Sequence, residues 1–336
     1  MKQAPLIFLV LLSSFTCIAQ TPQEMRETAL TFTRQGDFSN AILVLNKALQ
    51  AYPKNFIIQQ DLGLNYMYSN DFAKALEYIK PLLERPEASD QVYQVAGNLY
   101  QNLGDKKEAD KVYRRGIKAF PESGMLYNFY GQLLWDTKDP DAIGMFEKGI
   151  QVEPGYSKNY LNAAYYYADK NQLAWPLIYG EIFINIDPNG KETPKVKRML
   201  LDGYKKLFTA SDINSLINAE RSSFGKSYLQ TLSQQSSVLT QGIGAETLTM
   251  IRSRFILNWF NNPATSKFPF RLFEYQQQLL KEGYFSAYNQ WLFGPVQNIQ
   301  EFQNWTNTHK DDYAAFINFQ KGRIFKMPSG QYYYSN

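Results

Sequence analysis

This chain of 336 residues contains one cysteine, Cys17, and one histidine, His309. A disulfide needs two cysteines, and a protein zinc site usually draws on several Cys or His ligands, so neither is expected. A serine or cysteine triad would have to use His309, which we interpret as a loop residue before a helix. We therefore predict no metal, no other cofactor and no enzymatic activity.

Charge is nearly balanced, with 35 Lys and Arg residues against 31 Asp and Glu residues. A nucleic-acid surface needs a marked positive excess, so we predict no nucleic-acid partner. The basic residues that stand out along the sequence are Lys191, Lys195, Lys197, Arg198, Lys205 and Lys206. Two interpretations stay open for this cluster: a solvated helix face, or a contact with an anionic lipid or cell-wall polymer.

Long hydrophobic runs are also missing, apart from a short one near the start. After Lys2, an apolar stretch runs from Leu6 to Leu12, and a small-residue cleavage motif ends at Ala19. The stretch is too short to cross a membrane, which takes about 20 residues, but it fits a signal peptide over residues 1–19, cleaved before Gln20. We expect an exported protein, periplasmic or associated with the outer envelope, with no transmembrane span. The residues before the cysteine suit a lipoprotein signal poorly, so no lipid anchor is expected.

What the sequence does contain is a repeat of 34 residues. Small residues stand at this spacing at Ala29, Gly63, Gly97 and Gly131. Polar turns share the register at Gly36-Asp37-Phe38, Asn70-Asp71-Phe72 and Gly104-Asp105-Lys106. Apolar residues at helical spacing flank each turn, so each unit is expected to be a pair of helices. The second helix of the pair is closed by a proline at Pro53, Pro121, Pro154 and Pro188.

This order of small residue, turn, alanine and closing proline resembles the tetratricopeptide repeat family. Five units fit, at residues 22–55, 56–89, 90–123, 124–156 and 157–189. The resemblance implies an all-α fold, a right-handed superhelical solenoid of helix pairs over residues 22–189. In the fifth unit Pro176 takes the place of an alanine, and we expect the second helix there to be kinked or shifted.

In this family the first helix of each unit lines an inner groove that binds a partner protein or an extended peptide. Carried over by position, the groove residues are Gln60, Leu64, Tyr68, Gln94, Asn98, Gln101, Asn128, Gln132, Trp135 and Tyr165. Asn and Gln side chains both donate and accept hydrogen bonds, so a row of them suits a peptide backbone. Trp135 and Tyr165 would supply anchoring rings. A second interpretation stays open, in which the amides face water or bond between neighbouring helices.

Residues 190–336 do not continue the 34-residue repeat, but their sequence pattern remains helical. We predict a helix over residues 190–210 that caps the array, followed by an aromatic-rich helical domain over residues 211–336. This region resembles the C-terminal part of exported tetratricopeptide repeat proteins of Bacteroidetes type. Its densest aromatic stretches, residues 268–275 and 284–294, suit a packed helical hairpin. The alternative is a cleft that binds or processes a glycan or cell-wall polymer, with polar and stacking groups at Arg271, Glu274, Tyr288, Asn289 and Trp291.

Overall fold

The computed structural model describes residues 21–235, 242–331 and 333. The predicted signal peptide, residues 1–19, lies outside this part of the chain. All regular structure within the described ranges is helical, which confirms the predicted all-α fold. None of the helices found there combines the length and the apolar character that a membrane crossing requires.

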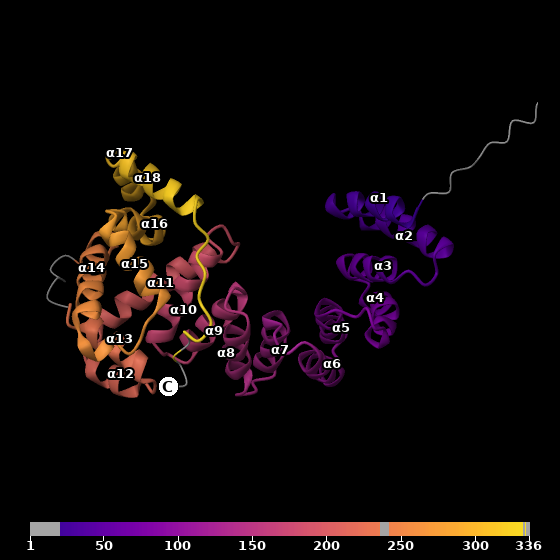
Figure 1. The fold of residues 1–336 in the computed structure, drawn as a ribbon, viewed down its shortest axis with the longest axis horizontal. Coiled ribbons are helices and arrows are strands. Elements are labelled where there is room, and N and C mark those ends of the chain that lie inside the picture. The colour runs from indigo at the N-terminus through magenta and orange to yellow at the C-terminus, as the bar shows by residue number, and fades with distance from the viewer. Residues whose placement is uncertain (1–20, 236–241, 332, 334–336) are drawn as a thin grey trace, which may run out of the picture. The chain divides into compact units, whose positions relative to one another are not determined.

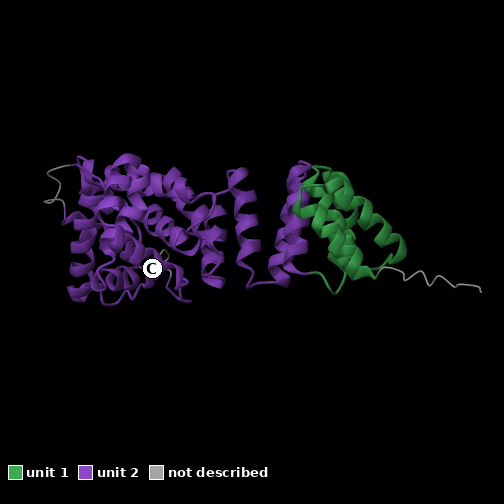
Figure 2. Cartoon of the chain, turned by 90° about the horizontal axis from the view of Figure 1, so that it is seen from above, with its two compact units in different colours: residues 1–88 green, residues 89–336 purple. Residues whose placement is uncertain are grey.

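The chain divides into two compact units, residues 1–88 and residues 89–336 (Figure 2). In the first unit the helices pack as two consecutive pairs, α1 with α2 and α3 with α4. Their bounds are α1 (Pro22–Arg34), α2 (Phe38–Ala51), α3 (Phe56–Tyr68) and α4 (Phe72–Ile79), followed by the 3-10 helix η1 (Lys80–Glu84). Each pair corresponds to one predicted repeat.

The second unit begins with three further pairs, in which each first helix also contacts the first helix of the next pair. Their bounds are α5 (Asp90–Asn102), α6 (Lys106–Ala119), α7 (Gly124–Asp136), α8 (Ala142–Val152), α9 (Ser157–Asp169) and α10 (Ala174–Ile186) (Figure 1). The first helices α5, α7 and α9 therefore form a continuous row, as in a stacked repeat array.

The turn inside each pair holds one residue in the left-handed region, which recurs every 34 residues over the first four turns and 33 residues later in the fifth. Its φ is 76° at Gly36, 63° at Asn70, 80° at Gly104, 60° at Lys138 and 56° at Asn171. Glycine and asparagine tolerate this conformation better than other residues. The fourth and fifth units therefore keep the turn geometry although their turn sequences differ from those of the first three.

The small residues of the repeat mark close contacts between the two helices of a pair. A Cβ atom on Gly97 of α5 would lie 2.4 Å from the ring of Tyr113 on α6. On Gly131 of α7 it would lie 2.6 Å from the ring of Phe146 on α8. Both rings are fully buried. The aromatic side chains thus occupy the space that a larger residue on the first helix would need.

Helix α10 runs without interruption, although Pro176 predicted a kinked or shifted helix. This proline is the third residue of a helix that runs over 13 residues from Ala174 to Ile186. Amides in the first turn of a helix have no intrahelical partner, so a proline there removes no hydrogen bond. Of the two alternatives expected for the fifth unit, the kink is therefore not observed, because the helix begins just before the proline.

The C-terminal part of the second unit is a further set of helices (Figure 1). Their bounds are α11 (Thr193–Thr209), α12 (Ile213–Ala219), α13 (Ser223–Ser233), α14 (Ala245–Asn261), the 3-10 helix η3 (Pro263–Thr265), α15 (Arg271–Lys281), α16 (Phe285–Gln297), α17 (Ile299–Thr308) and α18 (Lys310–Lys321). Helix α16 continues past its internal Pro295.

One hydrophobic core joins the last repeats to this C-terminal part. It extends from Phe146 on α8 to Tyr333 near the end of the chain. The predicted boundaries at residues 190 and 211 therefore mark a change in sequence pattern inside one core, and the predicted division into a repeat array and a C-terminal domain stays a prediction.

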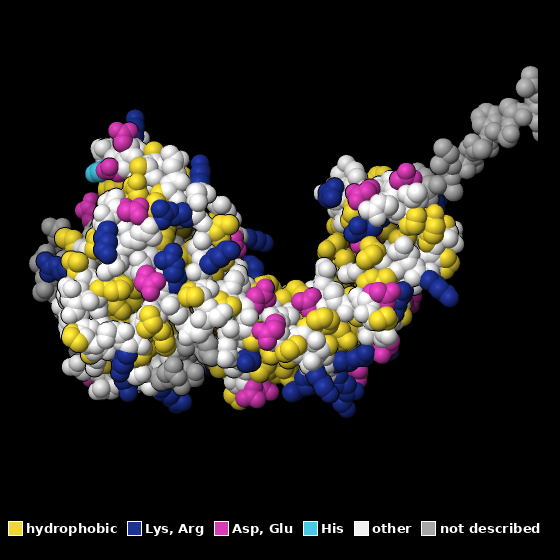
Figure 3. Space-filling model, in the orientation of Figure 1, with side chains coloured by type: hydrophobic (Ala, Val, Ile, Leu, Met, Phe, Trp, Pro, Cys, Tyr) yellow, Lys and Arg dark blue, Asp and Glu magenta, His cyan; other side chains and the backbone are white. Residues whose placement is uncertain are grey.

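Basic side chains gather over α6, seen as dark blue in Figure 3. This helix carries Lys106, Lys107, Lys111, Arg114, Arg115 and Lys118. Arg114 pairs with Asp110 at 3.0 Å, and Lys111 pairs with Glu108. The sequence pattern had singled out only the basic residues between 191 and 206, yet α6 is at least as basic, with part of its charge paired along the helix.

Candidate functional site

A hollow of about 530 Å³ lies over the row of first helices in the second unit. We call it the inner hollow. It is lined by Asn98, Gln101 and Asn102 of α5, by Gln132, Trp135 and Asp136 of α7, and by Asn162 of α9. Four of these seven residues, Asn98, Gln101, Gln132 and Trp135, are among the predicted groove residues.

The 34-residue repeat places matching positions of α5 and α7 side by side. Asn98, Gln101 and Asn102 are spaced i, i+3 and i+4, so they share one face of α5. The same spacing recurs on α7 at Gln132, Trp135 and Asp136. The close contacts at Gly97 and Gly131 hold α5 against α6 and α7 against α8. These contacts fix which face of α5 and α7 is left open toward the inner hollow.

Hydrogen bonds hold the amides of α5 in place. The hydroxyl of Tyr113 donates to Gln101 Oε1 at 2.8 Å and lies 3.2 Å from Asn98 Oδ1. Burial raises the pKa of Tyr113, so its hydroxyl stays protonated and remains a donor. Because the oxygen of Gln101 is engaged, its NH₂ group is left to donate outward. The side chain of Gln132 makes no hydrogen bond to any residue in the described part of the chain and is open at both ends of its amide.

Trp135 forms the apolar wall of the inner hollow. Its ring packs edge-on against Phe146 at 6.2 Å and against Tyr166 at 5.5 Å between ring centroids. Such edge-to-face contacts stabilise the ring orientation. The indole is half-buried, so one part is fixed by α8 and α9 while another part stays accessible. A rigid, partly exposed tryptophan next to open amides is typical of an anchoring position at an interface.

The inner hollow also contains three residues outside the ten predicted groove residues, Asn102, Asp136 and Asn162. Asp136 is exposed and stands 34 residues after Asn102, so the repeat register could have found it. Asn162 is 8% exposed and donates to Asn128 Oδ1 at 2.7 Å. The residues that line the inner hollow include an acidic side chain but neither lysine nor arginine.

Three other predicted groove residues of the second unit are engaged or lie elsewhere. Asn128 is 2% exposed and accepts the hydrogen bond from Asn162, so it links α7 to α9. Tyr165 donates to Glu192 at 3.1 Å, beside the start of α11. Gln94 is half-buried on α5 and does not line the inner hollow. For Asn128, the alternative of a bond between neighbouring helices is therefore the observed one.

The predicted groove residues of the first unit share a face of α3. Gln60, Leu64 and Tyr68 follow one another at intervals of four residues. Gln60 and Leu64 are half-buried, and Tyr68 is 46% exposed with its ring 5.6 Å from that of Phe38. An exposed tyrosine supported by a neighbouring ring can contact a partner, and this face belongs to the first unit alone.

Two residues of the predicted C-terminal cleft lie in the core. Tyr288 and Asn289 are fully buried, where Tyr288 donates to Glu181 Oε1 at 2.7 Å and Asn289 accepts from Arg252. The half-buried ring of Trp291 is covered by Lys197, whose Nζ lies 3.7 Å from the ring centroid.

The other two residues of that prediction, Arg271 and Glu274, both lie on α15. Arg271 stacks over Tyr275 and Phe325, and Glu274 is half-buried on α15. The aromatic spacing of this region therefore reflects a packed helical hairpin of α15 and α16, the other interpretation left open. Groups of three or more His, Cys, Asp or Glu side chains placed to hold a metal ion are absent from the described ranges.

Comparison with known proteins agrees with the repeat pattern. Residues 90–123, which contain α5 and α6, match the tetratricopeptide repeat family. The chain is 26% identical over 147 residues to Protein FlbA of Caulobacter vibrioides, a match that covers 43% of this chain and 24% of that protein. It is 25% identical over 138 residues to BBSome complex member BBS4 of Bos taurus, covering 40% and 25%. The matches thus span about a quarter of the length of these relatives. The chain contains a tetratricopeptide repeat, as predicted.

Among solved structures, the chain is similar to a tetratricopeptide repeat protein from Parabacteroides merdae, with 15% identity, a TM-score of 0.44, and coverage of 73% of this chain and 93% of that one. It is also similar to PilW, a type IV pilus biogenesis factor, with 16% identity, a TM-score of 0.48 and coverage of 59% and 91%.

Proposed function

We propose that this chain is an exported, non-enzymatic scaffold that holds an extended segment of a partner protein in the inner hollow. The observation that carries the proposal is the joint lining of one hollow of about 530 Å³ by open amides and a rigid tryptophan, on the row of first helices. Repeat arrays present such rows as extended binding surfaces.

The chemistry of the lining suits a peptide backbone. Gln101 can donate through its NH₂ group, and Gln132 can both donate and accept, which matches the alternating C=O and N–H groups of an extended chain. Trp135 would take one apolar side chain of the segment as an anchor. With Asp136 at the edge and no basic residue in the lining, a neutral or basic segment is favoured over an acidic one.

In this proposal residues 22–189 form the repeat array, and α11 covers its last helix pair. Contacts between α10 and α11 and the hydrogen bond from Tyr165 to Glu192 support that arrangement. Export rests on the signal peptide predicted over residues 1–19. Its test is the N-terminal sequence of the protein recovered from cells: a chain that starts at Gln20 supports export, and one that keeps Lys2 contradicts it.

The binding proposal is tested with a library of immobilised extended peptides, followed by calorimetric titration of the best ligand. In the variant Gln132→Ala with Trp135→Ala, affinity should fall by at least about tenfold, since loss of one anchoring residue commonly costs more than 1 kcal/mol. Gln91→Ala, on an exposed position of α5 outside the inner hollow, is the matched control and should bind as the parent does. Unchanged affinity in the double variant would show that the peptide binds elsewhere.

A further inference from the structure

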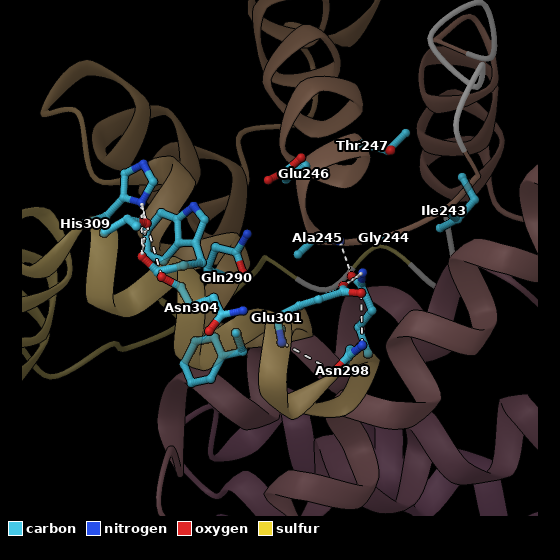
Figure 4. A pocket seen from close by; sticks show the side chains of 15 residues that line it. Ile243, Gly244, Ala245, Glu246, Thr247, Gln290, Asn298, Glu301, Asn304 and His309 are labelled. Carbon is cyan, nitrogen blue, oxygen red and sulfur yellow. Dashed lines mark hydrogen bonds between the residues drawn. The ribbon is translucent and has the colours of Figure 1, made fainter.

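A second pocket lies in the C-terminal part of the second unit, away from the repeat helices. It measures about 580 Å³ and is bounded by the start of α14, the C-terminal half of α16, and α17 (Figure 4). We call it the α17 pocket. Its volume falls within the range of about 300–1,000 Å³ that small-molecule sites occupy. None of the residues selected from the sequence for the predicted cleft lines it.

Two glycines make room for the side chains that line the α17 pocket. A Cβ atom on Gly294 of α16 would lie 2.6 Å from the ring of Phe302 and 2.9 Å from Gln290 Oε1. A Cβ atom on Gly244 would lie 2.8 Å from the amide of Gln297. Amide and aromatic groups therefore approach the bare backbone closely, and any larger residue at these positions would displace them.

Gln290 carries the strongest indication of a ligand. This residue is 5% exposed and lines the pocket from α16. Its side-chain amide makes no hydrogen bond to the residues that the structure describes, although it can donate twice and accept twice. Because Gln290 lines the pocket, its unpaired amide is open to whatever fills that space. A bound molecule that both donates and accepts hydrogen bonds would satisfy this group.

The charges around the pocket disfavour an anion. Glu246 and Glu301 line it, and its lining contains no lysine or arginine. Helix N-termini often bind anions through free amides, but here a side chain already accepts from at least one amide at each helix start. The amide of Ala245 at the start of α14 donates to Gln297 Oε1 at 2.6 Å. At the start of α17, the amide of Glu301 donates to Asn298 Oδ1 at 3.3 Å.

A flat aromatic surface stands beside these polar groups. The ring of His309 stacks on that of Trp305, with centroids 4.4 Å apart and an angle of 7° between planes. The Nδ1 of His309 lies 3.0 Å from the Trp305 carbonyl oxygen and 2.9 Å from Thr308 Oγ1, at the end of α17. Figure 4 shows Gln290 between His309 on one side and Ala245 with Glu246 on the other, with Asn304 and Glu301 next to it.

We infer that the α17 pocket binds a neutral saccharide unit. Sugar hydroxyls donate to carboxylates and both donate to and accept from amides, which matches Glu301, Asn304 and Gln290. The apolar C–H edge of a sugar ring can lie against Trp305. An apolar ligand would leave Gln290 unsatisfied, and an anionic ligand would meet two carboxylates. The inference is independent of peptide binding in the inner hollow.

The test titrates the full-length mature protein with N,N′-diacetylchitobiose and with maltose, both neutral, using saturation-transfer-difference NMR to measure affinity. Binding of at least one disaccharide is expected, weakened by about tenfold or more in Gln290→Ala and in Asn304→Ala, since each removes hydrogen bonds to the sugar. Gln303→Ala, on an exposed position of α17 outside the pocket, is the matched control and should leave affinity unchanged. Asn304 is exposed, so its replacement tests the site even if Gln290→Ala fails to fold.

Two results would overturn the inference. If neither disaccharide binds the parent protein, the pocket is not a saccharide site. If a disaccharide binds but Asn304→Ala and Gln290→Ala retain the parent affinity, the sugar is held elsewhere on the chain. Titration with spermidine distinguishes the ligand class, because binding of this polyamine alone would assign the two carboxylates to a cation instead.

Discussion

Glu181 on α10 and Arg252 on α14 form an ion pair in the interior of the second unit, where each residue is 2% exposed. Glu181 Oε1 also accepts hydrogen bonds from Tyr288 and Gln276, each at 2.7 Å. The carboxylate is thus held from α14, α15 and α16 at once. Polar contacts in the core therefore fix the last helix of the repeats to the C-terminal helices.

Replacing one partner of this pair should destabilise the second unit strongly. Arg252→Met leaves the Glu181 carboxylate buried without its counter-charge, and such losses cost about 3–5 kcal/mol. We expect this fall in the free energy of unfolding in urea denaturation followed by circular dichroism. Replacing both Glu181 and Arg252 with apolar residues should cost less than the sum of the single changes, because no lone charge then remains.

The control for this prediction is an exposed ion pair. Lys111 pairs with Glu108 on α6, and both side chains are well exposed to solvent. Lys111→Ala should leave the free energy of unfolding nearly unchanged, since exposed pairs contribute little. If Arg252→Met lowers stability no more than Lys111→Ala does, the buried pair does not hold the unit together.

Much of the helix pattern could be predicted because its physical causes are local. A small residue, a turn and a closing proline repeat along the chain, and α15 begins at Arg271 and ends at Lys281 as its apolar spacing indicates. Helix α17 could not be found this way. A proline inside a helix normally ends it, yet α16 continues past Pro295 to Gln297, and Asn298 both ends it and caps α17.

The candidate site was predictable only in part, for a different reason. Register alone places Asn98 with Gln132, and Gln101 with Trp135, on the open face, because equal positions in successive repeats face the same way. It does not say which amides are engaged by neighbours, and Asn128 is taken up by Asn162. The α17 pocket depends on contacts among α14, α16 and α17, which no local pattern reveals.

Close packing at the repeat glycines should make Gly97→Ala destabilising. The added methyl group would meet the ring of Tyr113, and overpacking of this kind costs about 1–3 kcal/mol. Gly144→Ala is the opposite case, since nothing lies within 4 Å of its Cβ position on α8. Removing a glycine from a helix should raise stability there by up to about 1 kcal/mol. Urea denaturation measures the free energy of unfolding of both variants. A change in the same direction in both would contradict this account of the repeat.

The fourth turn should be stabilised by glycine. Lys138 adopts a φ of 60°, where a residue with a side chain is strained by about 1 kcal/mol or more. Lys138→Gly should therefore raise the free energy of unfolding. The gain is about the strain that is relieved, reduced by the larger conformational entropy that glycine loses on folding. Lys148→Gly, within α8, should lower it by about 1 kcal/mol. Thermal unfolding of the two variants measures the contrast, and a loss of stability in Lys138→Gly would show that the turn carries no strain.

Lys197 compensates for the proline inside α16. In an unbroken helix the carbonyl of Trp291 would accept from the amide of residue 295, but Pro295 has no N–H. Lys197 Nζ donates to that carbonyl at 2.7 Å instead. The lysine is 8% exposed, and burial lowers its pKa to about 7. A neutral amine still donates a hydrogen bond, so the contact survives loss of the charge.

This arrangement predicts that stability rises with pH above neutrality. Between about pH 7 and the ordinary lysine pKa of 10.5, the unfolded chain holds a proton that the folded chain has released. The free energy of unfolding should therefore increase through this window, by up to about 1.4 kcal/mol per pH unit. Lys197→Met should remove the rise between pH 7 and pH 9 in urea denaturation, while Lys195→Met, at an exposed position on the same helix, should keep it. A parent protein whose stability stays flat over this window would mean that Lys197 remains charged when folded.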